Sequence, residues 1–175
     1  MHWITFIILV WAAAAVQQSV VPFFAVRTIQ PDLLVIIAVH YALAARAHDA
    51  LLACWVIGLV TDLSSLSFNQ APNVGLHAFS LGLLGWIVVK VRDLTFRESA
   101  MTQLLFTFMV KGSLSFLTGW YVWYAVGGAV SVRELTLTGI YSAAYTAILA
   151  PYGHWILRQM RNLLGITGSH RVRLH

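Results

Sequence analysis

The sequence predicts an all-α membrane protein whose six transmembrane helices pack into a compact bundle. Hydrophobic residues make up 59% of the 175 residues and charged residues only 10%, whereas soluble domains carry about 25% charged residues. The mean hydropathy is +0.78. This composition leaves too little polar surface to cover a soluble globule, so we expect the apolar runs to lie in lipid.

Six apolar runs separated by short polar connections fit the length of the chain, because one span needs about 20 apolar residues. The predicted spans are Trp3 to Val26, Pro31 to Ala45, Ala50 to Leu66, Val74 to Val91, Ser99 to Val126 and Leu135 to Leu157. The first lacks the basic segment of a signal peptide and is expected to be retained. The second is short for a span, so we expect it to tilt little or to thin the bilayer locally.

No connection is long enough for a soluble domain, which predicts one integral membrane domain over residues 1–175 with a short basic cytoplasmic tail at 162–175. Lys and Arg in short loops stay preferentially in the cytoplasm. With both termini inside, eight basic residues are cytoplasmic: Arg46, Lys90, Arg92, Arg97, Arg158, Arg161, Arg171 and Arg173. Only Arg27 and Arg133 then lie outside. This distribution predicts six spans with both termini in the cytoplasm.

Aromatic residues support the same orientation. Trp120, Tyr121, Trp123 and Tyr124 fall at the predicted outer end of the fifth span, where amphipathic rings favour the headgroup level of the bilayer. Membrane lipids are therefore expected partners.

Several classes of function are excluded by the composition and motifs. The net charge is +5, but the basic residues occur singly or in pairs and form no patch for nucleic acid. The single cysteine, Cys54, lies in an apolar run and permits no intrachain disulfide. The sequence has no nucleophile elbow, zinc motif, phosphate-binding glycine loop or close carboxylate pair. We therefore predict no enzyme activity, no catalytic residue, no metal and no cofactor.

Lys111 and Asp62 are the most unusual residues, because an ionisable group inside a span costs several kcal/mol without a partner. Lys111 lies about 10 residues into the fifth span and Asp62 about 12 residues into the third, at depths of roughly 15 and 18 Å. These depths predict that the two residues pair. A stripe of polar residues runs along the fifth span at helical spacing: Gln103, Thr107, Lys111, Ser115 and Thr118.

This stripe must face protein or water, because hydroxyl and ammonium groups lack partners in lipid. His40 and His77 are expected to project from the outer halves of the second and fourth spans. The predicted polar interior therefore contains Asp62, His77, Lys111 and His40. These residues either neutralise one another within the bundle or bind a partner or ligand, and the sequence leaves both interpretations open.

Small residues recur on one face of the fourth span. Gly75, Ala78, Gly82 and Gly85 are spaced by three, four and three residues. Such a stripe lets two membrane helices approach closely. We expect an internal contact, with Gly58 of the third span as the partner, in preference to an interface between copies.

Four short motifs, in order, resemble those of the rod shape-determining protein MreD family. They are Pro31-Asp32-Leu33-Leu34, Gly58-Leu59-Val60-Thr61-Asp62-Leu63, Gly75-Leu76-His77-Ala78 and Phe96-Arg97-Glu98-Ser99. The resemblance covers about residues 29 to 100. The chain departs from the family in the polar run from Ser64 to Val74, which replaces a glycine-rich turn and a Pro-Leu pair. Lys111 is also a residue that the family pattern does not predict.

The resemblance implies a non-enzymatic scaffold in the bacterial inner membrane, within the peptidoglycan-building machinery that maintains rod shape. Proteins of this family work with the bitopic protein MreC and, through it, with MreB and the glycosyltransferase RodA. The family fold is similar to that of the vitamin-binding S components of energy-coupling transporters. That similarity supplies an alternative function, the capture of a small molecule by the polar interior.

Overall fold

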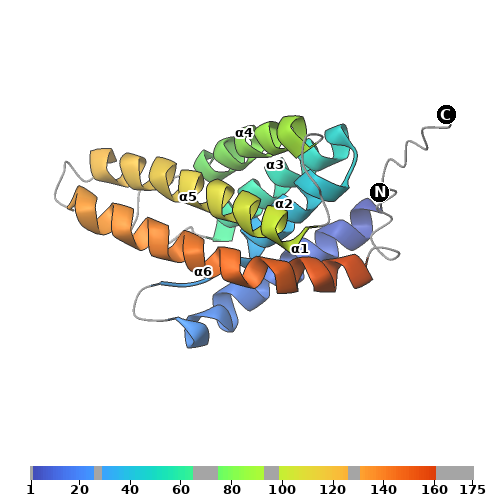
Figure 1. Cartoon of the computed structure of the whole chain (residues 1–175), viewed down its shortest axis with the longest axis horizontal. Helices are drawn as coiled ribbons and strands as arrows, with labels where there is room; N and C mark the ends of the chain where they lie inside the picture. The colour runs from blue at the N-terminus through green and yellow to red at the C-terminus, as the bar shows by residue number, and fades with distance from the viewer. Residues whose placement is uncertain (1, 26–28, 65–74, 93–98, 126–130, 161–175) are drawn as a thin grey trace.

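The computed structural model describes residues 2–25, 29–64, 75–92, 99–125 and 131–160. Within these ranges the chain forms the helices α1 (Trp3–Ser19), η1 (Val21–Phe24), α2 (Leu33–Ala44), α3 (Ala47–Ser64), α4 (Leu76–Val91), α5 (Ala100–Ala125) and α6 (Val132–Gln159) (Figure 1). The predicted all-α class is confirmed, and each predicted span corresponds to one α-helix. The basic tail, the polar run over residues 65–74 and the first three residues of the motif that begins at Phe96 lie outside the described residues.

The helix ends agree with the predicted spans to within a few residues, except after α1. This helix ends at Ser19, whereas the first apolar run was predicted to continue to Val26. Pro22 is the second residue of the short 3-10 helix η1 that follows. Because proline lacks a backbone N–H and disfavours the α conformation in the residue before it, the chain cannot continue α1 through this position.

α2 is the central helix of the bundle. It packs against α1, α3, α4, α5 and α6, and ten of its twelve residues are buried. At 1.5 Å per residue its length is about 18 Å, which is shorter than the hydrocarbon core of a bilayer, about 30 Å. Asp32, directly before α2, lies beside Lys111 near the middle of the longer helix α5, and this offset determines which polar residues meet.

The surrounding helices bury one face and expose large apolar side chains on the other. The core includes Phe6, Tyr41, Ile57, Leu81 and Leu114, none more than 2% exposed. Ile4, Phe79, Met109 and Trp155 are between 59% and 78% exposed. Helices that are apolar all round are typical of protein surrounded by lipid.

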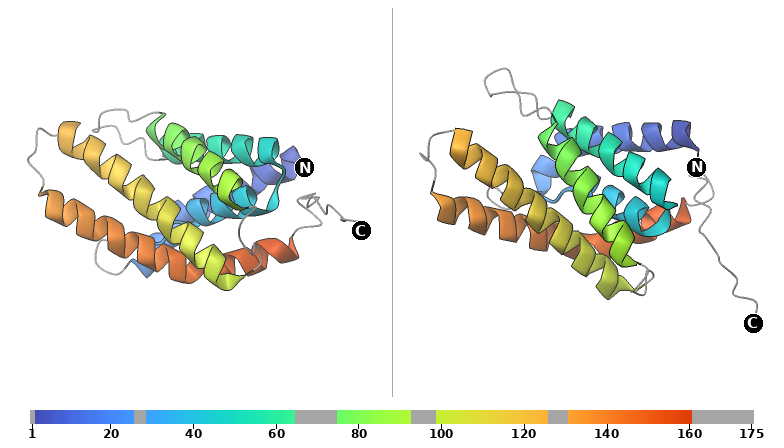
Figure 2. Two further views of the ribbon diagram at one scale, coloured as in Figure 1. Left: turned by 45° about the horizontal axis from the view of Figure 1, so that its top comes forward. Right: turned by 90° about the horizontal axis from the view of Figure 1, so that it is seen from above.

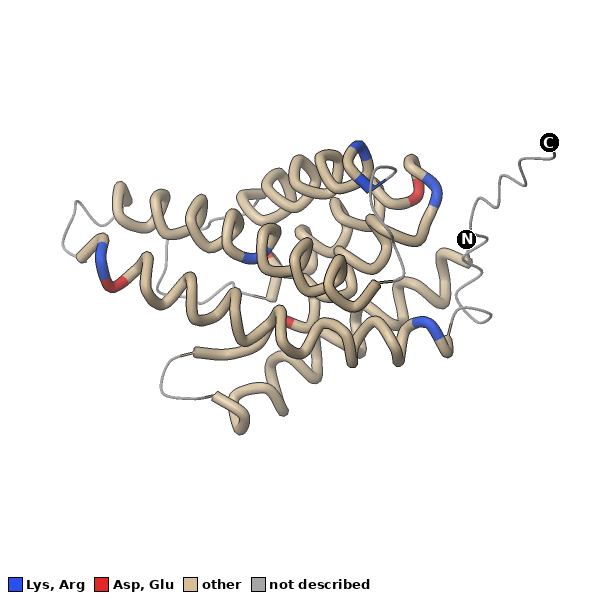
Figure 3. The backbone as a smooth tube through the Cα atoms, in the orientation of Figure 1, with Lys and Arg blue, Asp and Glu red and all other residues tan. Residues whose placement is uncertain are grey.

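Two of the described helices, Ala47–Ser64 and Ala100–Ala125, are long and apolar enough to cross a membrane by length and composition. The shorter apolar helices are Trp3–Ser19, Leu33–Ala44 and Leu76–Val91. Charged residues in the described part of the chain gather toward helix ends, with few along the helices (Figure 3). The number of spans and their orientation remain predictions.

α5 and α6 pack against each other as an antiparallel hairpin and extend beyond the rest of the bundle (Figure 2). They have 26 and 28 residues, so each is about 40 Å long. The end of α5 and the start of α6 project past α3 and α4 (Figure 1). In this projecting part of the hairpin, α5 and α6 contact each other and are not covered by α1 to α4.

Candidate functional site

Asp62, near the end of α3, binds the first turn of α4. Its Oδ2 accepts hydrogen bonds from the backbone N–H groups of Gly75 at 2.9 Å and Ala78 at 3.1 Å. Its Oδ1 accepts from the His77 backbone N–H at 3.1 Å and contacts His77 Nδ1 at 2.8 Å. The first N–H groups of a helix have no partner within the helix and carry partial positive charge. Asp62, only 1% exposed, therefore caps α4 from a different helix.

Gly75 has a conformational role in this cap. It precedes α4 with φ of 101°, a left-handed conformation that residues with a Cβ adopt at a cost. A Cβ on Gly75 would meet no atom within 4 Å. Gly75 therefore does not belong to the helix-packing stripe in which the sequence placed it, and its backbone N–H binds Asp62 instead.

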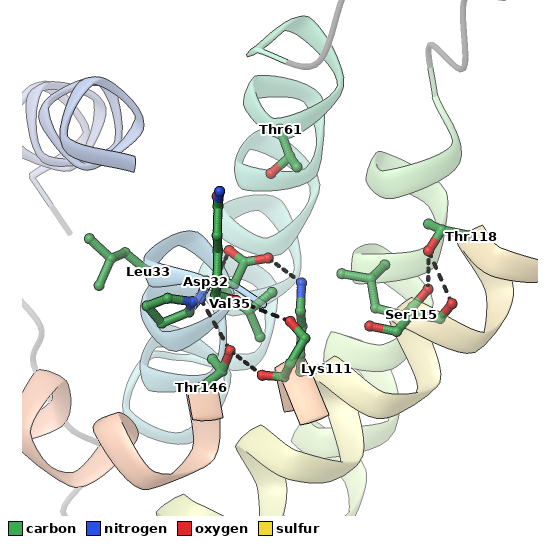
Figure 4. Close-up of polar contacts among 12 residues, drawn as sticks. Asp32, Leu33, Val35, Thr61, Lys111, Ser115, Thr118 and Thr146 are labelled. Carbon is green, nitrogen blue, oxygen red and sulfur yellow. Dashed lines mark hydrogen bonds and ion pairs between the residues drawn. The ribbon is translucent and has the colours of Figure 1, made fainter. Parts of the chain in front are cut away.

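Lys111 pairs with Asp32, so the predicted pairing with Asp62 is wrong. The Lys111 Nζ lies 2.6 Å from Asp32 Oδ2, and the two side chains are 15% and 14% exposed (Figure 4). Asp32 precedes α2, and its Oδ1 accepts from the Val35 N–H at 3.2 Å as an N-cap. The depth estimate failed because it assumed that all spans start at one plane. The short α2 begins beside the middle of α5.

Three further contacts join the start of α2 to its neighbours. The Asp32 N–H donates to Thr146 Oγ1 of α6 at 3.1 Å (Figure 4). Gln17 of α1 accepts from the Leu33 N–H and donates to the Pro31 carbonyl, both at 2.9 Å. The Pro31-Asp32 junction is thus bound by α1, α5 and α6. Lys111 and the Pro31-Asp32 motif were both identified in the sequence, but a contact between them was not predicted.

His40 meets His154 of α6, with 2.9 Å between their Nδ1 atoms. One ring must donate and the other accept, so the neutral pair holds one proton between these two atoms. His40 is the eighth residue of α2. In the predicted orientation α2 runs inward, which would place His40 in the inner half, so the expected outer-half position of His40 and that orientation do not agree. Neither His40 nor Lys111 contacts the Asp62–His77 cap directly, but His77 lies close enough to Asp32, the partner of Lys111, to interact with its charge.

The remaining residues of the small-residue stripe form the contact between α3 and α4. A Cβ on Gly58 would lie 2.5 Å from the Ala78 Cα and 2.6 Å from the His77 carbonyl oxygen. A Cβ on Gly82 would meet the Trp55 ring, and one on Gly85 would lie 2.6 Å from the Cys54 Sγ. The structure thus places Gly58 against Ala78, and Gly82 and Gly85 face other residues of α3.

Arg92 is a buried residue that was predicted to lie in a cytoplasmic connection. It is 8% exposed, and its Nη1 donates to the carbonyl oxygens of Ala42 at 2.7 Å and Ala45 at 2.6 Å. The last carbonyl groups of a helix lack partners within it, so Arg92 caps the C-terminal end of α2. In the sequence Arg92 directly follows an apolar run, and this position suits either an exposed residue of a loop or a residue that caps another helix.

The polar stripe of α5 faces inward over its first half, where Gln103 is 5% and Thr107 0% exposed. The hydroxyl of Thr107 donates to the Gln103 carbonyl, and that of Thr118 to the Leu114 carbonyl. These polar groups bond within their own helix. Among the described residues, no group of three or more metal-binding side chains is present.

An apolar groove lies between α5 and α6 and runs from the middle of α5 toward the end where the hairpin projects. Its volume is about 360 Å³, and none of the residues that line it is ionisable. Large side chains such as Phe116 and Trp120, about 60% exposed, form one wall. The groove does not include Asp62, His77, Lys111 or His40, so the polar residues predicted from the sequence and this groove are separate features.

Comparison with known proteins gives one match. The family described as rod shape-determining protein MreD matches residues 1–159. No curated protein matches the chain. No solved structure matches it either, so the expected similarity to transporter S components stays a prediction.

Proposed function

Because the chain belongs to the MreD family of rod shape-determining proteins, we propose that it is a multi-pass scaffold of the bacterial inner membrane. In this proposal it holds an MreC-like bitopic protein within the machinery that builds the side wall, and through that protein it is linked to MreB and RodA. Both termini lie in the cytoplasm. Family membership carries the role in cell shape, and the features below support the scaffold mechanism.

The exposed apolar surface supports a location in lipid. Large hydrophobic side chains are exposed on α1, α3, α4, α5 and α6, and the largest exposed apolar patch on a typical soluble monomer is only a few hundred Å². The excess of Lys and Arg in the connections proposed to be cytoplasmic supports the orientation.

The polar residues of the interior bind one another, and this supports a scaffold function in preference to the capture of a small molecule. The carboxylate of Asp62 is occupied by four contacts at the start of α4, and Lys111 is paired with Asp32. A ligand-binding site needs a hollow with a few convergent polar groups. The groove between α5 and α6 has no ionisable group, and its wall residues Phe116 and Trp120 are exposed on the surface. An open apolar groove suits a protein partner better than a vitamin.

Cell shape tests this role. In the rod-shaped bacterium that encodes the chain, we expect its depletion to convert rods into rounded cells, and expression of the chain from a plasmid to restore rods. The aspect ratio of the cells is the measurement. Depleted cells that keep their rod shape, while a vitamin-uptake defect appears, would contradict the scaffold and favour the capture function.

A further inference from the structure

We propose that the groove between α5 and α6, here called the α5–α6 groove, is the docking site for one transmembrane helix of the scaffolded partner. This inference rests on the proposed function and specifies its binding surface. The occupant is a single apolar helix, uncharged over about four turns and carrying hydrogen-bonding groups, such as Ser or Thr side chains, on the face that enters the groove.

The floor of the groove consists of small residues at the line where α5 and α6 meet. A Cβ on Gly112 would lie 3.9 Å from the Ala143 Cβ, and one on Gly139 would lie 3.0 Å from the Ser115 Cβ. The two helices therefore approach closely along this line. The larger side chains on both sides then stand above the floor and leave a channel between them.

The wall formed by α5 has the spacing of a helix-packing surface. Met109, Ser113, Phe116, Trp120 and Trp123 line the groove at intervals of four, three, four and three residues. This 3.5-residue period keeps one face of a helix against a partner helix along several turns. Met109, Phe116 and Trp120 are 59%, 62% and 61% exposed, so the described part of the chain leaves this surface uncovered.

The length of the groove fits a helix. From Phe108 to Trp123 the lining residues of α5 extend over about 22 Å at 1.5 Å per residue. A span of 20 residues is about 30 Å long, so one helix can follow the groove for most of its own length. On the opposite wall, Val132, Thr136 and Ile140 repeat every four residues, which is also a helical interval.

The chemistry of the groove favours a protein helix over a lipid chain. None of its lining residues is ionisable, so a charged face on the occupant would find no charged partner in the groove, and an unpaired charge within the hydrocarbon layer is costly. Within the described part of the chain, the hydroxyl groups of Ser113 and Ser115 make no hydrogen bond. Hydroxyl groups of membrane helices gain stability from partners on a neighbouring helix, and an acyl chain offers none.

Site-specific crosslinking tests this docking site. A photoreactive phenylalanine analogue replaces Phe116 or, as a matched control, Phe79 on α4, which is 66% exposed and lies outside the groove. The full-length chain is co-expressed with the MreC-like protein of the same genome and irradiated in native membranes. We expect Phe116, but not Phe79, to crosslink to the partner, and mass spectrometry to place the crosslink within the partner's membrane helix.

A filling variant provides the second readout. In Ser113→Phe a phenyl ring replaces the small serine side chain and fills part of the groove. We expect retention of the partner in a pull-down to fall on the order of tenfold, equivalent to about 1.4 kcal/mol. Phe79→Ala serves as the control and is expected to retain the partner fully. Equal thermal stability of the two variants excludes misfolding as the cause.

Other outcomes separate the docking site from the proposed function. If the wild-type chain retains the partner but Phe116 crosslinks only to lipid, or only to a second copy of this chain, the docking site is contradicted and the scaffold function stands. Full retention of the partner by Ser113→Phe also contradicts the docking site. If the wild-type chain retains no MreC-like partner under any of these conditions, the proposed function itself fails.

Discussion

Lys111 of α5 lies 2.6 Å from Asp32 at the start of α2, and this ion pair joins the projecting hairpin to the central helix of the bundle. Asp62, the acidic residue nearest to Lys111 in estimated depth, is bound to the first turn of α4 instead. The two acidic residues therefore have separate structural roles, and their substitution is expected to have separate consequences.

The Asp32–Lys111 pair predicts a coupling between the two residues. Asp32→Asn and Lys111→Met are each expected to lower the free energy of unfolding, by about 3 kcal/mol, because each leaves a largely buried charge without its partner. The double variant is expected to lose less than the sum, with a coupling of about 1 to 3 kcal/mol. Unfolding of the detergent-solubilised protein measures all four forms.

A second cycle with Asp62→Asn and Lys111→Met is the control for this coupling. Its losses are expected to add within about 0.5 kcal/mol, since the two residues have different partners. Coupling in the second cycle and additivity in the first would contradict the assignment of partners.

Asp62 is predicted to hold the start of α4. Asp62→Ala removes an acceptor of three backbone N–H groups and is expected to cost about 4 to 5 kcal/mol, because each hydrogen bond to a charged group contributes about 1.5 kcal/mol at the lower end of its range. Hydrogen–deuterium exchange is expected to speed up at the amides of Gly75, His77 and Ala78. Asp49→Ala, in the first turn of α3, is the control and is expected to cost less than about 1 kcal/mol. Unchanged exchange at these amides would show that the cap is dispensable.

Gly58 is predicted to be the most sensitive glycine of the contact between α3 and α4. In Gly58→Ala the new methyl group would meet backbone atoms of α4 at 2.5 and 2.6 Å, which forces the helices apart at a cost of about 1 to 3 kcal/mol. Gly112→Ala is the matched control, because its methyl group would have no neighbour nearer than 3.9 Å. A lower thermal midpoint is expected only for Gly58→Ala. Equal midpoints would mean that the close approach is not required.

The orientation of the chain is testable by cysteine labelling in a Cys54→Ala background. A membrane-impermeant reagent applied from outside is expected to label a cysteine at Glu134, near the start of α6, and to leave one at His48, near the start of α3, unlabelled until the cells are lysed. The physical reason is the excess of Lys and Arg in the proposed cytoplasmic connections. Labelling of His48 but not Glu134 in intact cells would reverse the orientation.

The sequence was sufficient for features that depend on a local pattern. Apolar runs of adequate length located each helix, and the spacing of Ala78, Gly82 and Gly85 indicated the face of α4 that meets α3 at Gly58. The steric requirement is the same wherever such helices pack, so the pattern predicts the contact without knowledge of the whole fold.

The partners of the charged residues could not be predicted in this way. Residue counts along each span give only a depth, and they assume that all helices start at one plane. The twelve-residue α2 breaks this assumption, so Asp32 meets the middle of α5. Arg92 resembled a loop charge for the same reason, because its acceptors Ala42 and Ala45 lie at the end of another helix. The α5–α6 groove likewise depends on how far the hairpin projects, although the regular spacing from Met109 to Trp123 is visible in the sequence.

The most direct test of the scaffold function is the identification of what binds the chain in its native membrane. The tagged full-length chain, purified from native membranes in mild detergent, is expected to retain an MreC-like bitopic protein at a near-constant ratio, as determined by quantitative mass spectrometry. An ATPase module or a bound vitamin in its place, with no MreC-like protein, would contradict the scaffold.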